Sequence, residues 1–71
     1  MEKETAIAIL PLVNDLQNME YLNFYIDKRI ALLQKNLEAE PDEKVIRQLQ
    51  GRIQELRRLK TLKDDVQRIL K

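Results

Sequence analysis

A proline near the middle of the chain separates two helical patterns of nearly equal length. Pro41 cannot continue a helix that arrives from its N-terminal side, because proline lacks an N–H group and its ring clashes with the preceding turn. It does suit the first position of a new helix. We therefore expect one helix to end near Ala39 and another to begin at Pro41. Asp42 and Glu43 would then lie in the first turn of the second helix, where carboxylates meet the positive end of the helix dipole.

The two patterns are apolar repeats of helical period. The first is a heptad repeat that runs through Leu12, Leu16, Met19, Asn23, Ile26, Ile30, Leu33 and Leu37, with Asn23 as its one polar member. The second runs through Ile46, Leu49, Ile53 and Leu56, followed by Leu59, Leu62 and Val66. Its spacing shortens by one residue after Leu56. The second helix therefore either overwinds there or turns its C-terminal half toward a different neighbour.

Folding about Pro41 places the two apolar patterns opposite each other. The resulting pairs are Leu37–Ile46, Leu33–Leu49, Ile30–Ile53, Ile26–Leu56 and Leu16–Val66. Asn23 falls opposite Leu59 and Lys60, where the spacing changes, and either fixes the register as a buried amide or is tolerated there half-exposed. Every pair is apolar, and the irregularities of the two patterns fall at the same level. Both observations favour an antiparallel hairpin over a single continuous rod, although Pro41 by itself is also compatible with a kinked rod.

We therefore predict an all-α protein: an antiparallel, coiled-coil-like two-helix hairpin preceded by a lead-in segment. The single domain, residues 1–71, would contain the lead-in 1–10, a helix over 11–39, a turn at 40–41 and a helix over 41–70. Pro11 either starts the first long helix or interrupts a short separate helix capped by Thr5. We favour a lead-in that lies over the end of the hairpin.

The composition limits which interactions can stabilise the fold and which reactions its side chains can catalyse. A chain of 71 residues has a thin core, and without Cys or His it has no disulfide, no zinc ribbon, no thiol nucleophile and no imidazole base. Self-association or docking on a larger assembly is the support that is left. The adjacent Asp64 and Asp65 point in different directions on a helix, and no Gly-rich loop or serine nucleophile motif occurs. We predict a protein that is not an enzyme and takes no cofactor, metal or small-molecule substrate.

The longest uncharged apolar run, residues 6–13, is too short to span a bilayer and contains Pro11. The N-terminus has no small-residue cleavage pattern. We therefore expect a soluble, intracellular protein without a membrane partner.

The candidate protein interface consists of residues outside the heptad pattern: Tyr21, Phe24, Tyr25, Leu32 and Gly51. A two-helix hairpin does not need this second apolar face, so the face is expected to meet a third element. The alternatives are the N-terminal segment, another copy of the chain, a different protein, or nucleic acid. Gly51, inside the second helix, either lets a partner or third helix approach the backbone at the level of Ala31 or is a neutral exposed position.

The second half of the chain is basic. Residues 1–40 carry four basic and seven acidic side chains, whereas residues 41–71 carry nine basic and five acidic ones. The candidate anion contacts are Arg47, Arg52, Arg57 and Arg58. They either bind phosphates of RNA or DNA in a hairpin dimer or form a solvated, ion-paired face, in which Arg47 meets Glu43 and Arg57 comes near Asp27. The mixed signs favour the solvated face.

Two segments resemble a known group of proteins. Residues 26–33 (IDKRIALL) and 46–59 (IRQLQGRIQELRRL), within the region 25–66, look like small helical-hairpin proteins of tailed bacteriophages, with LQGRI as the most particular piece. The resemblance implies a virion or assembly component, or a small protein that acts on a host factor such as an enzyme, in the host cytoplasm or the virion. The resemblance identifies no binding residue in this chain. In layout alone the chain is also similar to plasmid-copy-control RNA-binding hairpins, which dimerise into four-helix bundles.

Overall fold

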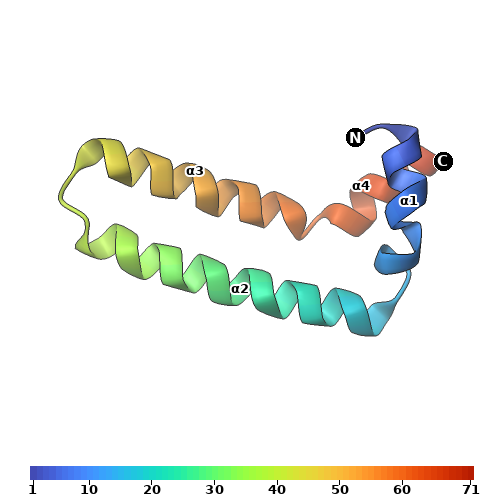
Figure 1. The fold of residues 1–71 in the computed structure, drawn as a ribbon, viewed down its shortest axis with the longest axis horizontal. Helices are drawn as coiled ribbons and strands as arrows, with labels where there is room; N and C mark the ends of the chain where they lie inside the picture. Colours follow the sequence, from blue (N-terminus) through green and yellow to red (C-terminus); the bar gives the residue numbers. More distant parts are fainter.

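The computed structural model describes all 71 residues and contains four α-helices and no strand. The helices are α1 (Lys3–Val13), α2 (Leu16–Ala39), α3 (Glu43–Leu59) and α4 (Leu62–Leu70). Helices α2 and α3 run side by side in opposite directions, while α1 and α4 meet at the far end, where the two termini also lie (Figure 1). The all-α class is confirmed. The expectation of two long helices is wrong, because each of them is broken once.

The first break separates α1 from α2 and places residues 1–10 largely inside a helix rather than in a lead-in. Pro11 neither starts the long helix nor interrupts the short one, because it lies inside the last turn of α1, where its missing N–H group costs one helical hydrogen bond. Thr5 does not cap α1, which begins after Glu2 without a side-chain cap. Helix α2 begins at Leu16, after its N-cap Asp15, whose Oδ1 accepts a hydrogen bond of 3.0 Å from the backbone N–H of Asn18.

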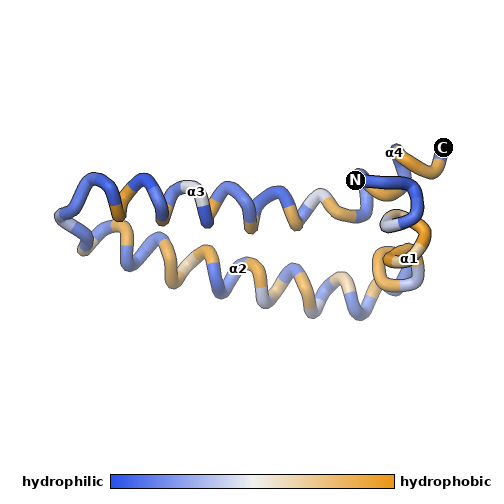
Figure 2. Tube along the Cα trace, turned by 45° about the horizontal axis from the view of Figure 1, so that its top comes forward, coloured by the Kyte–Doolittle hydropathy of each residue, from blue (hydrophilic) through white to orange (hydrophobic).

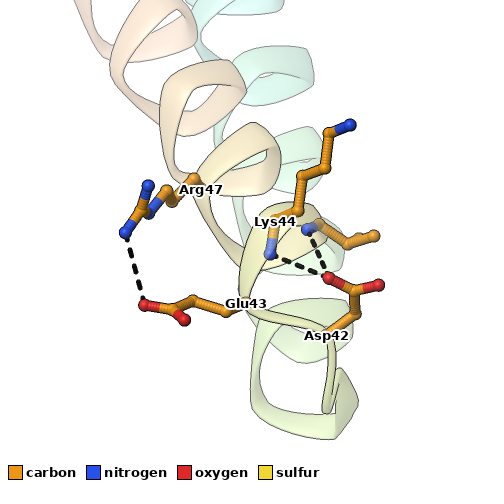
Figure 3. Close-up of polar contacts among 5 residues, drawn as sticks. Asp42, Glu43, Lys44 and Arg47 are labelled. Carbon is orange, nitrogen blue, oxygen red and sulfur yellow. Dashed lines mark hydrogen bonds and ion pairs between the residues drawn. The ribbon is translucent and has the colours of Figure 1, made fainter.

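The second break is the expected turn at Pro41. Helix α2 ends at Ala39, as predicted, but α3 begins two residues later than predicted, because Asp42 serves as its N-cap. The Asp42 carboxylate accepts hydrogen bonds from the backbone N–H groups of Lys44, at 2.8 Å, and Val45, at 3.4 Å (Figure 3). Side-chain capping satisfies donors that a helix start leaves without partners.

The third break, at Lys60 and Thr61, falls just after the predicted change of spacing. The N–H groups of Lys60 and Thr61 bond to the carbonyls of Arg57 and Arg58, three residues back, which tightens the end of α3. Helix α4 then packs against α1 rather than continuing along α2. Of the two alternatives for the spacing change, the turn toward a different neighbour is therefore the one observed.

Two apolar clusters hold the helices together. A central cluster joins α2 to α3 through Leu33, Leu49 and Ile53, with Ile30 packed against it. The predicted pairs Leu33–Leu49 and Ile30–Ile53 therefore lie in one cluster. A terminal cluster joins α1, α2 and α4 through Ala6, Val13, Met19 and Val66. Apolar residues dominate α1 but recur only at intervals along the largely hydrophilic α3 (Figure 2). The fold thus depends on α1, which no two-helix hairpin would need.

The predicted pair Leu16–Val66 is wrong. Val66 is fully buried in the terminal cluster, whereas Leu16 is 72% exposed. The reason is the chain break at Asp15: it makes Leu16 the first residue of α2, and Val13 of α1 lies with Val66 in the cluster. None of the four helices combines the length and the apolar character that crossing a membrane requires.

Candidate protein-interaction surface

Four large side chains form an exposed stripe on α2, which we call the aromatic face: Tyr21, Phe24, Tyr25 and Leu32. Their exposed fractions are 64%, 65%, 58% and 49%. Because successive residues of an α-helix are about 100° apart, the stripe is centred about 140° around α2 from the buried Met19, Ile26 and Leu33. The helix therefore uses one side for the core and carries a second apolar side away from α3.

No part of the chain covers the aromatic face. Covering by the N-terminal segment was one expected alternative, and it is wrong for a physical reason. The inward residues of α1, Ala6 and Val13, are already used in the terminal cluster with Val66, so α1 lies against α4 and the beginning of α2. What is left of the alternatives is an occupant from outside the chain.

A cation lies within the aromatic face. The Lys28 Nζ atom is 5.3 Å from the centre of the Phe24 ring, within the range of a cation–π contact. Lys28 takes part in none of the four ion pairs of the molecule. The face can therefore receive apolar groups, and at its middle it also presents a positive charge to an aromatic ring or an anion.

Gly51 does not join the aromatic face. A Cβ atom built on it would meet nothing within 4 Å, and no glycine of the chain has a positive φ. It lies two residues from both Leu49 and Ile53, and helical spacing turns it about 180° from their mean direction, away from α2. Gly51 and Ala31 are both exposed but belong to no common surface in this chain, so the predicted interface is divided between two helices.

The four candidate anion contacts also do not converge. Arg47 pairs with Glu43 at 3.3 Å and Arg58 with Glu55 at 3.9 Å, both within α3. Arg52 and Arg57 form no ion pair, but helical spacing places them about 140° apart. The expected approach of Arg57 to Asp27 is wrong, since Lys60 occupies that position with its Nζ atom 2.7 Å from the Asp27 Oδ1 atom. The arrangement is a dispersed charged surface.

In its side-chain exposure Asn23 matches the half-exposed alternative. Asn23 is half-buried, and its Oδ1 atom is buried without a hydrogen-bond partner. The exposure of Leu16 was not predicted, although Asp15 before it indicates a helix start. The one hollow on the surface is lined by Asp64, Gln67, Arg68 and Lys71, which all come from the C-terminal end of the chain. No group of three or more Asp or Glu side chains is placed to hold a metal ion.

No protein-family model, curated protein or solved structure matches this chain. The aromatic face is the most developed surface feature, because it gathers every aromatic residue of the chain in one exposed stripe.

Proposed function

We propose that this chain is a non-enzymatic interaction protein that docks on a protein surface through the aromatic face. The observation that carries the proposal is the exposure of Tyr21, Phe24 and Tyr25, each more than half open to solvent on one side of one helix. Tyrosine and phenylalanine are enriched at protein interfaces because they cover a large area with few rotatable bonds, and tyrosine keeps a polar tip. An exposed cluster of such rings is typical of a docking surface.

The area of the aromatic face limits the free energy that its rings can contribute to binding. A fully covered aromatic side chain buries about 150–250 Å², and more than half of that is open here, so covering three rings removes on the order of 300 Å² from water. At about 25 cal/mol per Å² this is roughly 8 kcal/mol before the costs of association. Those costs are about 4–15 kcal/mol, so the rings supply a core for an interface that needs additional contacts around it.

The finer architecture and the biological setting form part of the same proposal. We propose that the α2–α3 pair is a helical hairpin completed by association with another protein surface. The resemblance of residues 26–33 and 46–59 to phage hairpin proteins supports a role in virion assembly. Inhibition of a host enzyme through the same face is a variant of this proposal, since a helix presenting an apolar stripe fits a groove on a partner.

A triple substitution tests the aromatic face directly. Tyr21, Phe24 and Tyr25 are changed together to Ser, and the matched control changes three exposed α3 residues, Gln48, Gln50 and Gln54, to Ser. We expect both variants to stay helical by circular dichroism. Only the aromatic variant should lose self-association and the proteins that co-purify with the wild-type chain. Retention of all associations by a helical aromatic variant would show that the face is not the interface.

Binding of RNA or DNA through α3 is the second candidate, and the observation in its favour is that Arg52 and Arg57 form no ion pair. Phosphate binding displaces counterions, so affinity would fall steeply as salt rises. A titration of labelled single- and double-stranded RNA and DNA at about 50 mM salt decides this candidate. Binding that disappears in an Arg52→Gln, Arg57→Gln variant supports it, and absence of binding removes it.

A further inference from the structure

We infer that the occupant of the aromatic face is a second copy of this chain, with the α2 helices of the two copies packed antiparallel about a two-fold axis. The inference rests on the proposed function and names the partner. It is supported by the area the chain leaves open, by the shape of the molecule, and by the order of residues along the face.

The chain exposes more surface than a compact monomer of its mass. Its accessible surface is 5667 Å², whereas the general relation between mass and surface gives about 4,700 Å² for a monomer of 8.5 kDa. The excess of about 1,000 Å² is close to the roughly 800 Å² that each partner buries in a standard protein–protein interface. One interface of ordinary size would therefore bring the chain to the exposure of a compact protein.

The shape agrees with this excess. The molecule measures 44 × 24 × 14 Å, and its radius of gyration of 14.8 Å exceeds the roughly 11 Å of a compact domain of this length. The smallest extent is little more than the diameter of one helix, about 10–12 Å. Stable domains pack at least two layers of secondary structure around a core, and a molecule this thin leaves large apolar side chains exposed, as it does on α2.

The residues on the outer side of α2 form a second seam of coiled-coil type. Tyr21, Tyr25, Lys28 and Leu32 follow one another at spacings of four, three and four residues, the alternation that keeps a seam facing a partner helix. In an antiparallel pair of such seams, Tyr21 of one copy lies level with Leu32 of the other, and Tyr25 lies level with Lys28. Phe24, which already contacts Lys28 at 5.3 Å, borders the seam.

Charge selects the antiparallel orientation. In a parallel pair, Lys28 would face Lys28 of the other copy, and like charges directly opposite are destabilising. In the antiparallel pair each Lys28 lies beside Tyr25 of the other copy, where a cation–π contact replaces the repulsion. The net charge of +1 per chain adds little long-range repulsion between copies.

The mass in solution is the first test. Light scattering and sedimentation over about a hundredfold range of concentration should give twice the chain mass of 8.5 kDa at the upper end. The double variant Tyr21→Ser, Tyr25→Ser should raise the dimer dissociation constant at least about thirtyfold, the loss typical of removing one aromatic anchor. Gly51→Ala, on the far side of α3, should leave the constant unchanged.

Cross-linking tests the orientation, and the absence of native cysteine makes single cysteines unambiguous reporters. Under mild oxidation, a mixture of Tyr21→Cys and Leu32→Cys chains should form a disulfide between the two variants. Neither variant should cross-link to itself, since residues 21 and 21 of the two copies lie roughly 16 Å apart along the helix at 1.5 Å per residue. Self-linking of Tyr21→Cys would overturn the antiparallel arrangement.

The outcomes separate this inference from the proposed function. A chain that is monomeric at every concentration, yet loses its co-purifying proteins in the aromatic triple variant, overturns the second copy as occupant and leaves the docking face in place. A dimer that is unaffected by the tyrosine substitutions overturns the second copy as occupant, and if the aromatic triple variant also keeps its co-purifying proteins, the docking face is overturned as well.

Discussion

The Lys60 Nζ atom lies 2.7 Å from the Asp27 Oδ1 atom, and among the four ion pairs of the molecule this one alone joins residues far apart in the sequence. Asp27 is in the middle of α2, and Lys60 follows the last residue of α3. The pair therefore ties the end of α3 to α2 just before the chain bends into α4. The unpartnered amide of Asn23 lies one helical turn away from Asp27 on α2.

We expect the Asp27–Lys60 pair to make a small, salt-dependent contribution to stability. The side chains are 59% and 40% exposed, and pairs of this kind contribute about 0.2–1 kcal/mol. A double-mutant cycle with Asp27→Asn and Lys60→Gln, measured by urea unfolding, should give a coupling in this range that shrinks at about 1 M salt. The cycle of Lys60→Gln with Glu43→Gln is the control and should show no coupling. A coupling that does not change with salt would contradict solvent exposure of the pair.

Replacing Asn23 by leucine should stabilise the protein. The buried Oδ1 atom of Asn23 has no hydrogen-bond partner, and an unsatisfied buried polar atom costs about 1–3 kcal/mol. We expect Asn23→Leu to raise the free energy of unfolding by about 1 kcal/mol. Asn23→Asp should lower it, because a charge is harder to bury than an amide. Asn18→Leu, at an exposed position, is the control. Destabilisation by Asn23→Leu would indicate that the amide holds the register.

Ile26 and Leu16 occupy seam positions of the same heptad pattern, but they should respond very differently to truncation. Ile26 is 1% exposed and Leu16 is 72% exposed. Ile26→Ala should cost about 2–5 kcal/mol, because it leaves a cavity at a fully buried position of α2. Leu16→Ala should change the free energy of unfolding by less than about 0.5 kcal/mol. Equal losses in the free energy of unfolding, measured by thermal or urea unfolding, would indicate that Leu16 is buried in the core.

Gly51→Ala should stabilise α3. The position is inside a helix, its backbone φ is not positive, and an added methyl group would meet nothing within 4 Å. Alanine is favoured over glycine in a helix by about 1 kcal/mol, so the free energy of unfolding should rise by about that amount. The reverse substitution at an exposed site of α2, Ala31→Gly, should lower it by a similar amount. If Gly51→Ala instead weakened association, Gly51 would belong to an interface.

Local chemistry explains which parts of the fold were predictable. The end of α2 at Ala39 follows from Pro41, and the joint packing of Leu33 and Leu49 follows from the period of the two patterns. Helix boundaries set by caps were partly readable, since Asp15 and Asp42 are residues that favour the position before a helix. The expected start of α3 is two residues early because the sequence assigns Pro41 the first helical position, which Glu43 occupies after the N-cap Asp42.

The sequence by itself determined the helical class, the division at Pro41 and the existence of a second apolar face on α2. Only the tertiary structure decided that α1 and α4 form a cluster with Met19 of α2 and that nothing in the chain covers Tyr21, Phe24 and Tyr25. The reason is physical. A periodic pattern records which side chains of a helix avoid water, whereas the neighbour that covers them is chosen by long-range packing, in which chain breaks such as the one at Thr61 redirect an entire helix.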